Sequence, residues 1–268
     1  MTKQISISSL TIYPVKSLAG ISLESAELDS MGLKNDRRWM LVTPEGDFLS
    51  QRKIPKMALI QPRFVDDQLI LSHDKQEDFV VPVANPQHTM QVTIWKDSVT
   101  ALRIGDAADE WLSQILEIKC HLVYIPDSEV RQCDLEFSKQ GERTGFADGF
   151  PILLISQASL DNLNKRLEEP VEMRRFRPNI VVTGSEAFAE DNWKTFTLGN
   201  IPMRGVKPCS RCILTTVNPD TGEREGAEPL KTLMTYRKEG SKVLFGQNII
   251  HEALGTLAIG DRLSTPSK

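Results

Sequence analysis

Short apolar segments separated by turn residues dominate the first hundred residues of this chain, and this pattern restricts the fold more than any other feature. Apolar and polar residues roughly alternate within several of the segments, which predicts half-buried β-strands. Asp66-Asp67 and Asn85-Pro86 are typical turn pairs between them. The predicted strands cover residues 5–15, 21–28, 59–65, 69–71, 79–83 and 91–95. We therefore expect a β-rich first half.

Helical periodicity appears later in the chain. Asp106 is expected to cap a first helix, Ser156 a second, and Pro229 to begin a third. The first helix would bury one apolar face that consists of Trp111, Leu112, Ile115 and Leu116. Residues 127–145 are polar and lack periodicity, which predicts a long loop that is either mobile or a functional cover. The expected fold class is α+β, mostly β, with a few helices.

Composition excludes several classes of protein. The 268 residues are 40% hydrophobic and 25% charged, with a net charge of −4, which is typical of a globular protein and gives no electrostatic footprint for nucleic acid. The N-terminal residues lack the apolar core of a signal peptide, and no run of about 18 apolar residues predicts a membrane helix. We therefore expect a cytoplasmic protein that contacts neither nucleic-acid polymers nor membranes and keeps its four cysteines reduced.

Two of the four cysteines, Cys209 and Cys212, lie in one Cys-x-x-Cys motif between cationic residues. Lys207 and Arg211 are expected to favour the thiolate, which is the form of cysteine that attacks electrophiles and binds metals. The β-branched residues at 213–217 predict an extended segment directly after the motif. The motif is therefore a candidate chemical site.

Four interpretations of this motif compete. A structural zinc site needs two further ligands at suitable spacing, but Cys120, Cys133 and the four histidines are scattered. A thioredoxin-type redox pair needs a helix after its first cysteine, which the extended segment disfavours. Both cysteines could also simply pack as small apolar residues at the start of a strand. Finally, one soft thiolate suits a heavy transition metal whose other ligands come from a cofactor.

Further polar clusters stand at the ends of predicted strands, distant in sequence and so able to converge in space. Lys16 and Ser17, close to Gly20, could bind a phosphate, and Arg37 could direct its guanidinium at an oxyanion while Asp36 holds it. The clusters are residues 13–17, Asp36-Arg37, residues 146–151, residues 176–179, residues 207–217 and residues 245–248. Together, in this order, they resemble the motifs of the MOSC-domain family.

The branch that the chain resembles most contains the bacterial N-hydroxylaminopurine-detoxifying proteins and the mitochondrial amidoxime-reducing components. This resemblance implies a MOSC β-barrel with a smaller β-rich N-terminal domain, at residues 124–268 and 1–123, respectively. About the first 37 residues would dock into the catalytic barrel, because Lys16 and Arg37 must reach its site.

The resemblance also implies a bound molybdenum cofactor. Cys212 would be the molybdenum ligand and Cys209 a neighbour, while Lys16, Ser17 and Arg37 would hold the cofactor phosphate. The residues that would line the pterin and the metal are Asp148, Arg177, Asn179, Ser210 and Arg211. These roles agree with the chemistry of the side chains, since thiolates suit soft metals and cations suit phosphates.

The implied activity is the reduction of N-hydroxylated small molecules, such as hydroxylaminopurines, amidoximes and hydroxylamines, to amines. Asp148 could supply the proton to nitrogen, or it could hold the pterin instead. The sequence lacks a Cys-x4-Cys-x2-Cys run, so we expect electrons from a separate flavin reductase, ferredoxin or cytochrome. The rival functions are a sulfur carrier with a cysteine persulfide, and a module that binds or delivers the cofactor without turnover.

Overall fold

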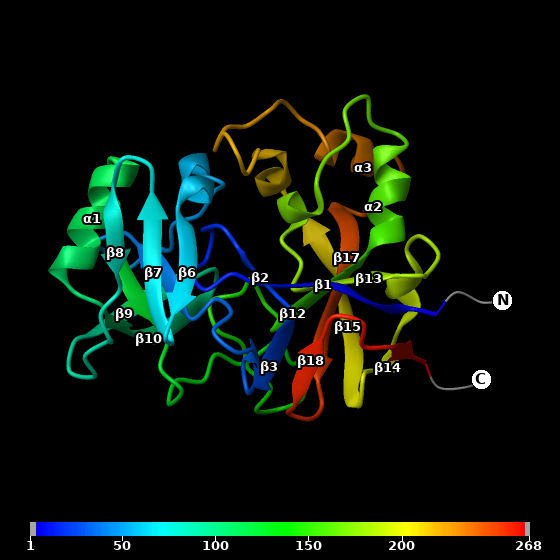
Figure 1. Cartoon of the computed structure of the whole chain (residues 1–268), viewed down its shortest axis with the longest axis horizontal. Helices are drawn as coiled ribbons and strands as arrows, with labels where there is room; N and C mark the ends of the chain where they lie inside the picture. Colours follow the sequence, from blue (N-terminus) through cyan, green and yellow to red (C-terminus); the bar gives the residue numbers. More distant parts are fainter. Residues whose placement is uncertain (1–3, 266–268) are drawn as a thin grey trace.

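Nine strands form the largest sheet of the protein, and they come from both ends of the chain (Figure 1). The structure, a computed structural model, describes residues 4–265. The order of this sheet is β19-β14-β15-β17-β12-β13-β1-β2, with β16 paired to β17, and only β12 and β13 run parallel. Its strands are β1 (Ser6–Ile12), β2 (Ile21–Leu23), β12 (Ile152–Ser156), β13 (Ile180–Thr183), β14 (Thr195–Leu198), β15 (Ile201–Arg211), β16 (Lys238–Glu239), β17 (Lys242–His251) and β19 (Leu263–Ser264).

β12 is buried on both faces, which explains its uninterrupted apolar sequence. Leu154 belongs to one hydrophobic core, inside the nine-stranded sheet, together with residues of β1 and β13. Ile155 belongs to a second core, which is covered by the helices α2 (Gln157–Asn164) and α3 (Leu230–Tyr236). The apolar faces of these helices therefore close the outer side of the sheet.

Residues 39–124 form a second β-rich unit, which Figure 1 shows beside the large sheet. Its four-stranded sheet has the order β5-β11-β10-β9, and its three-stranded sheet the order β6-β7-β8. The strands are β5 (Trp39–Val42), β6 (Gln61–Val65), β7 (Gln68–His73), β8 (Gln76–Val80), β9 (Thr89–Ile94), β10 (Asp97–Arg103) and β11 (His121–Tyr124). A third small sheet joins β3 (Ser25–Asp29) to β4 (Gly32–Leu33) and β18 (Thr256–Ala258). The prediction of a mostly β fold with few helices is confirmed.

The helix α1 (Asp106–Leu116) packs on this unit and buries the predicted apolar face. The predicted N-cap is wrong, however, because Gly105 is the N-cap and Asp106 is the first helical residue. The Asp106 carboxylate accepts a hydrogen bond from Arg103 instead of capping the helix. In α2, by contrast, the Ser156 hydroxyl accepts a hydrogen bond from the Ser159 N–H, as the sequence predicts.

Two strands of the large sheet, β1 and β2, precede the second unit in the sequence. β1 pairs with β13 and β2, and the chain then leaves this sheet. The backbone between β1 and β5 crosses from one unit to the other, where the Arg37 N–H donates to the Tyr13 carbonyl. The domain boundary at residue 123 remains a prediction, and its outer limits at residues 1–3 and 266–268 lie outside the described residues.

The extended segment predicted after the cysteine motif is wrong. β15 includes Cys209 and ends at Arg211, and Ile213–Thr216 forms a 3-10 helix with Cys212 as its N-cap. The Thr215 hydroxyl donates to the Cys212 carbonyl, and the Thr216 hydroxyl donates to the Ile213 carbonyl. These local hydrogen bonds stabilise the tight turn, and they outweigh the β-propensity of the threonines. Cys212 therefore stands at the end of a strand.

The loop at residues 127–145 is irregular, as expected, but hydrogen bonds fasten it. Arg131 is 5% exposed and donates to the carbonyls of Gly145 and Ala147. Its Nε also donates to the Asp97 carboxylate at 2.8 Å. The loop thus fixes the backbone that leads to Asp148. Within residues 4–265, no helix is both long and apolar enough to span a membrane.

Candidate functional site

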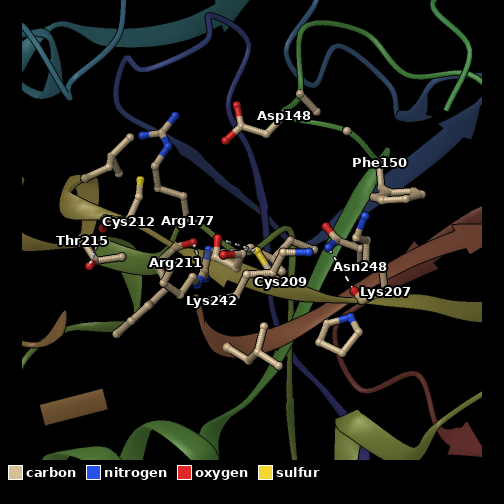
Figure 2. Close-up of a pocket in the computed structure, with 18 of the residues that line it drawn as sticks. Asp148, Phe150, Arg177, Lys207, Cys209, Arg211, Cys212, Thr215, Lys242 and Asn248 are labelled. Atoms are coloured by element: carbon tan, nitrogen blue, oxygen red, sulfur yellow. Dashed lines mark hydrogen bonds between the residues drawn. The ribbon is translucent and has the colours of Figure 1, made fainter. Parts of the chain in front are cut away.

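A cavity of about 640 Å³ is lined by residues from both halves of the molecule. In Figure 2, Cys212 and Thr215 lie on one side of it, and Phe150, Lys207 and Asn248 on the other. All nine site residues predicted from the sequence line this one cavity, namely Lys16, Ser17, Arg37, Asp148, Arg177, Asn179, Ser210, Arg211 and Cys212. Motifs that are distant in sequence therefore converge on a single site, although the role of each residue stays a prediction.

The lining of this cavity is strongly cationic. Eight lysine or arginine side chains face two carboxylates there, whereas the whole chain carries a net charge of −4. The cations are Lys16, Arg37, Arg52, Arg175, Arg177, Lys207, Arg211 and Lys242, and the carboxylates are Asp148 and Glu239. Such a concentration of positive charge favours an anionic ligand.

Four cavity residues have a left-handed backbone. Ser17, Arg37, Trp95 and Arg177 have φ values of 67°, 48°, 57° and 55°, which is uncommon for residues other than glycine. Backbone of this kind costs about 1–3 kcal/mol per residue and persists only where the surrounding structure enforces it. Their presence here makes the cavity a candidate functional site.

A buried network fixes Arg37. Its Nη1 lies 2.6 Å from an Asp36 carboxylate oxygen and donates to the Asn179 Oδ1 at 2.9 Å, while Nη2 donates to the Arg177 carbonyl. The predicted contact between Asp36 and Arg37 is therefore present. Asn179 also donates to the Thr11 carbonyl, so both ends of its amide are occupied within the protein. Asn179 thus orients Arg37.

Asp148 is the centre of a second network. Its Oδ1 lies 2.5 Å from the Lys16 Nζ and accepts from the Trp95 indole at 3.2 Å, and its Oδ2 lies 3.0 Å from Arg52. Desolvation alone would raise the pKa of this carboxyl, but the charges of Lys16 and Arg52 hold the pKa well below its usual range. Asp148 is therefore ionised at neutral pH. This state disfavours its predicted role as a proton donor and favours a positioning role.

Lys16 is buried, with its side chain 7% exposed, and also donates to the Phe146 carbonyl at 2.8 Å. Burial lowers the pKa of Lys16 to about 8, although the charge of Asp148 opposes this shift. Burial also lowers the pKa of Arg177 to about 10. Burial thus disfavours the charged form of both side chains, and an anionic ligand would stabilise it.

The two motif cysteines have different neighbours. Arg52 Nε donates to the Cys212 Sγ at 3.1 Å, whereas Arg211 donates to the Cys209 Sγ at 3.2 Å. Lys207 was expected beside the thiolates, but its Nζ lies 4.1 Å from the centroid of the Phe137 ring. Burial raises the pKa of the Cys209 thiol. It also raises the pKa values of Cys120 and Cys133 to about 11 and 12, so these two cysteines are structural.

Sequence reasoning missed Arg52 and Trp95. Arg52 lies in the segment between β5 and β6, and Trp95 lies between β9 and β10, so both come from the first half of the chain. Neither stands in a motif, and Arg52 is 160 residues away from the cysteine that it contacts. No local sequence pattern could have identified them.

The donors in the cavity fit a cofactor that carries its own metal ligands. Among residues 4–265, no three His, Cys, Asp or Glu side chains gather as a metal site, so a metal beside Cys212 would take most of its ligands from elsewhere. In the same part of the chain, Arg177 Nη2 and Arg211 Nε are buried without a hydrogen-bond partner. Buried donors need acceptors. A phosphate- and ring-bearing cofactor would supply them.

Proteins with similar sequences are named mitochondrial amidoxime-reducing components 1 and 2. The chain is 35% identical to mitochondrial amidoxime-reducing component 1 of Mus musculus over 95% of this chain and 80% of the relative. The human protein of the same name is also 35% identical, over 95% and 81%. Mitochondrial amidoxime reducing component 2 of Bos taurus is 34% identical, over 95% and 81%.

These names contradict one prediction from the sequence. The relatives are called mitochondrial, so the expected cytoplasmic location is wrong. That expectation depended on the lack of an apolar signal peptide, which is a test for secretion.

Two family models cover most of the chain. The MOSC N-terminal beta barrel domain matches residues 4–119, and the MOSC domain matches residues 141–264. Both matches agree with the mostly β architecture and with the resemblance inferred from the motifs. This chain therefore belongs to the MOSC-domain family, in the branch of the amidoxime-reducing components.

Proposed function

We propose that this protein is an oxidoreductase that uses molybdenum cofactor to reduce N-hydroxylated compounds to amines. Relatives that share about a third of their residues over 95% of the chain are named for the reduction of amidoximes. The observation that supports this most is the position of Cys212, a soft ligand, in a cationic cavity with two unpaired arginine donors.

The residues of the cavity suggest how the cofactor would be held. Cys212 would ligate the metal, and the free N–H groups of Arg177 and Arg211 would donate to acceptors on the cofactor. Lys16 and Arg37 would neutralise its phosphate, and Ser17 would hydrogen-bond to it. When bound, molybdenum cofactor supplies the two-electron reduction that removes oxygen from an N–OH group.

The chain's own side chains prepare the site. Conversion of an N–OH group to N–H and water consumes two electrons and two protons. Asp148, being ionised, would hold Lys16 and Arg52 in place, and the network around Arg37 would keep the guanidinium fixed without motion during turnover. A preorganised cationic cavity of this kind stabilises negative charge at low cost.

The electrons would come from a separate protein. The relatives are called components, and this sequence contains four cysteines and no Cys-x4-Cys-x2-Cys run for an iron–sulfur cluster. A flavin reductase, a ferredoxin or a cytochrome would provide the reducing equivalents. Turnover by the purified chain with NADH alone would contradict this part of the proposal.

Reduction of an aromatic amidoxime to its amidine tests the function. The cofactor-loaded protein receives electrons from a chemically reduced viologen dye, and the product is measured by chromatography. We expect turnover in the wild type and none in Cys212→Ser. Cofactor loading without N-reduction by any donor would indicate a delivery module, and sulfur transfer from a cysteine persulfide without metal would indicate a sulfur carrier.

A further inference from the structure

Arg52 links the proposed metal ligand to the opposite half of the molecule. Its Nε donates to the Cys212 Sγ at 3.1 Å, and its Nη2 lies 3.0 Å from the Asp148 carboxylate. Its guanidinium carbon also lies 4.5 Å from the centroid of the Trp95 ring. One planar group thus contacts a thiol, a carboxylate and an aromatic face. Figure 2 shows Cys212 and Asp148, its two polar partners, at the same cavity.

The surroundings restrict Arg52 to this position. The Trp95 indole donates to the same Asp148 carboxylate, so Arg52, Asp148 and Trp95 form a closed ring of contacts. Trp95 itself is held in a left-handed conformation and packs at 5.0 Å against Phe48. The Arg52 side chain is 20% exposed. Its partners therefore leave it little freedom.

Hydrogen bonds to two distant segments of the chain hold the backbone around Arg52. The preceding residue, Gln51, is buried and donates to the Ser17 carbonyl at 2.8 Å. The Arg52 carbonyl accepts a hydrogen bond from Arg224, which pairs with Val217 shortly after Cys212. Arg52 therefore touches both Cys212 and the segment that follows it.

We propose that Arg52 is a positioning residue that fixes the direction of the Cys212 sulfur toward the cavity. This inference relies on the proposed function, since it assigns Cys212 as the metal ligand. Only arginine can donate to sulfur and carboxylate at once from a rigid fork while it stacks on an indole. Lysine would keep the charge, but its ammonium lacks the planar fork and the stacking on the indole. The orientation of the ligand then depends on both halves of the molecule.

Two substitutions test this role, with Arg63→Lys as the matched control. Arg63 pairs with Asp78 on the outer face of the same half, away from the cavity. Outer-shell partners of a metal ligand typically change metal affinity by about 10–100-fold. We therefore expect molybdenum loss during dialysis to be at least about tenfold faster in Arg52→Lys and Arg52→Met than in the wild type. Arg63→Lys should match the wild type.

A second measurement uses the cofactor-free protein, so it does not depend on metal. Trypsin cleaves after Arg204, Arg211 and Arg224, which places Cys209 and Cys212 in separate peptides, residues 205–211 and 212–224. Because the contact with Arg52 holds the Cys212 sulfur toward the open cavity, iodoacetamide should alkylate Cys212 more slowly in Arg52→Met than in the wild type. The alkylation rate of Cys209 should be unchanged and serves as an internal reference.

The two measurements separate the possible failures. If wild-type protein takes up no molybdenum, the proposed function fails. If it takes up molybdenum but Arg52→Lys retains it like the wild type, a general cation is sufficient and the positioning role is wrong. Equal alkylation of Cys212 in the wild type and Arg52→Met would also overturn the role, because the contact would then have no effect on the sulfur.

Discussion

Replacement of Asp148 by asparagine removes the only negative charge among the contacts of Lys16 and Arg52 described above. Asparagine is nearly isosteric with aspartate, so the packing around Phe146 and Trp95 is preserved. The change therefore isolates the charge. The charge of Asp148 and its hydrogen bond both raise the pKa of Lys16, which is about 8 in the wild type. Without the Asp148 charge, burial would therefore lower this pKa further.

The size of the effect follows from the exposure of the two partners. Loss of one partner of a buried ion pair costs about 3–5 kcal/mol, whereas an exposed pair contributes about 0–1 kcal/mol. The Lys16 side chain is 7% exposed and the Asp148 side chain 59%. We therefore expect Asp148→Asn to reduce the free energy of unfolding by about 1–2 kcal/mol at pH 7, between these limits.

The loss should be smaller at pH 10. Folded Lys16 loses its proton as the pH rises through about 8, so its attraction to Asp148 is present below that pH and absent above it. Urea unfolding of the cofactor-free protein at both pH values measures the difference. Asp78→Asn is the control, since the Arg63–Asp78 pair is half-exposed and should contribute much less to the free energy of unfolding. Equal losses in the two variants would refute this electrostatic account of Lys16 and Asp148.

Two further predictions concern Lys16 and Cys209. Cofactor retention in the wild type should decline as the pH rises through about 8, where Lys16 loses its charge, and Lys16→Arg should shift this decline upward, because arginine stays protonated. A pterin-fluorescence assay of dialysed protein measures retention, and the same decline in both proteins would exclude Lys16 as its cause. Cys209→Ser should keep molybdenum near the wild-type content, since Arg211 contacts Cys209 whereas Arg52 contacts Cys212. Loss of the metal in Cys209→Ser, measured by elemental mass spectrometry, would contradict the assignment of Cys212 as the ligand.

The sequence predicts which residues meet in the cavity better than it predicts the local structure around them. Lys16, Arg37, Asp148 and Arg177 follow or precede apolar strands, and their motifs converge in one cavity. The resemblance to a family supplied this grouping, since periodicity alone does not show which strand ends meet. Individual strands were predictable because their apolar residues enter the core.

Features that depend on particular side-chain contacts, whether distant or local, escaped prediction. Arg52 has no motif, and its importance appears only when the first half of the chain folds against Cys212. The 3-10 helix at Ile213–Thr216 was missed because threonine hydroxyls bond to the local backbone there, which β-propensity does not include. Asp106 failed as an N-cap because Arg103 engages its carboxylate.

Molybdenum content is the most direct test of the central assignment. The protein is expressed in a host that makes the cofactor, and metal is measured by elemental mass spectrometry together with the fluorescence of the oxidised pterin. We predict about one molybdenum per wild-type chain, and in Cys212→Ser either loss of the metal or retained cofactor without activity. Absence of both molybdenum and pterin from the wild type would contradict the assignment and favour the sulfur-carrier alternative.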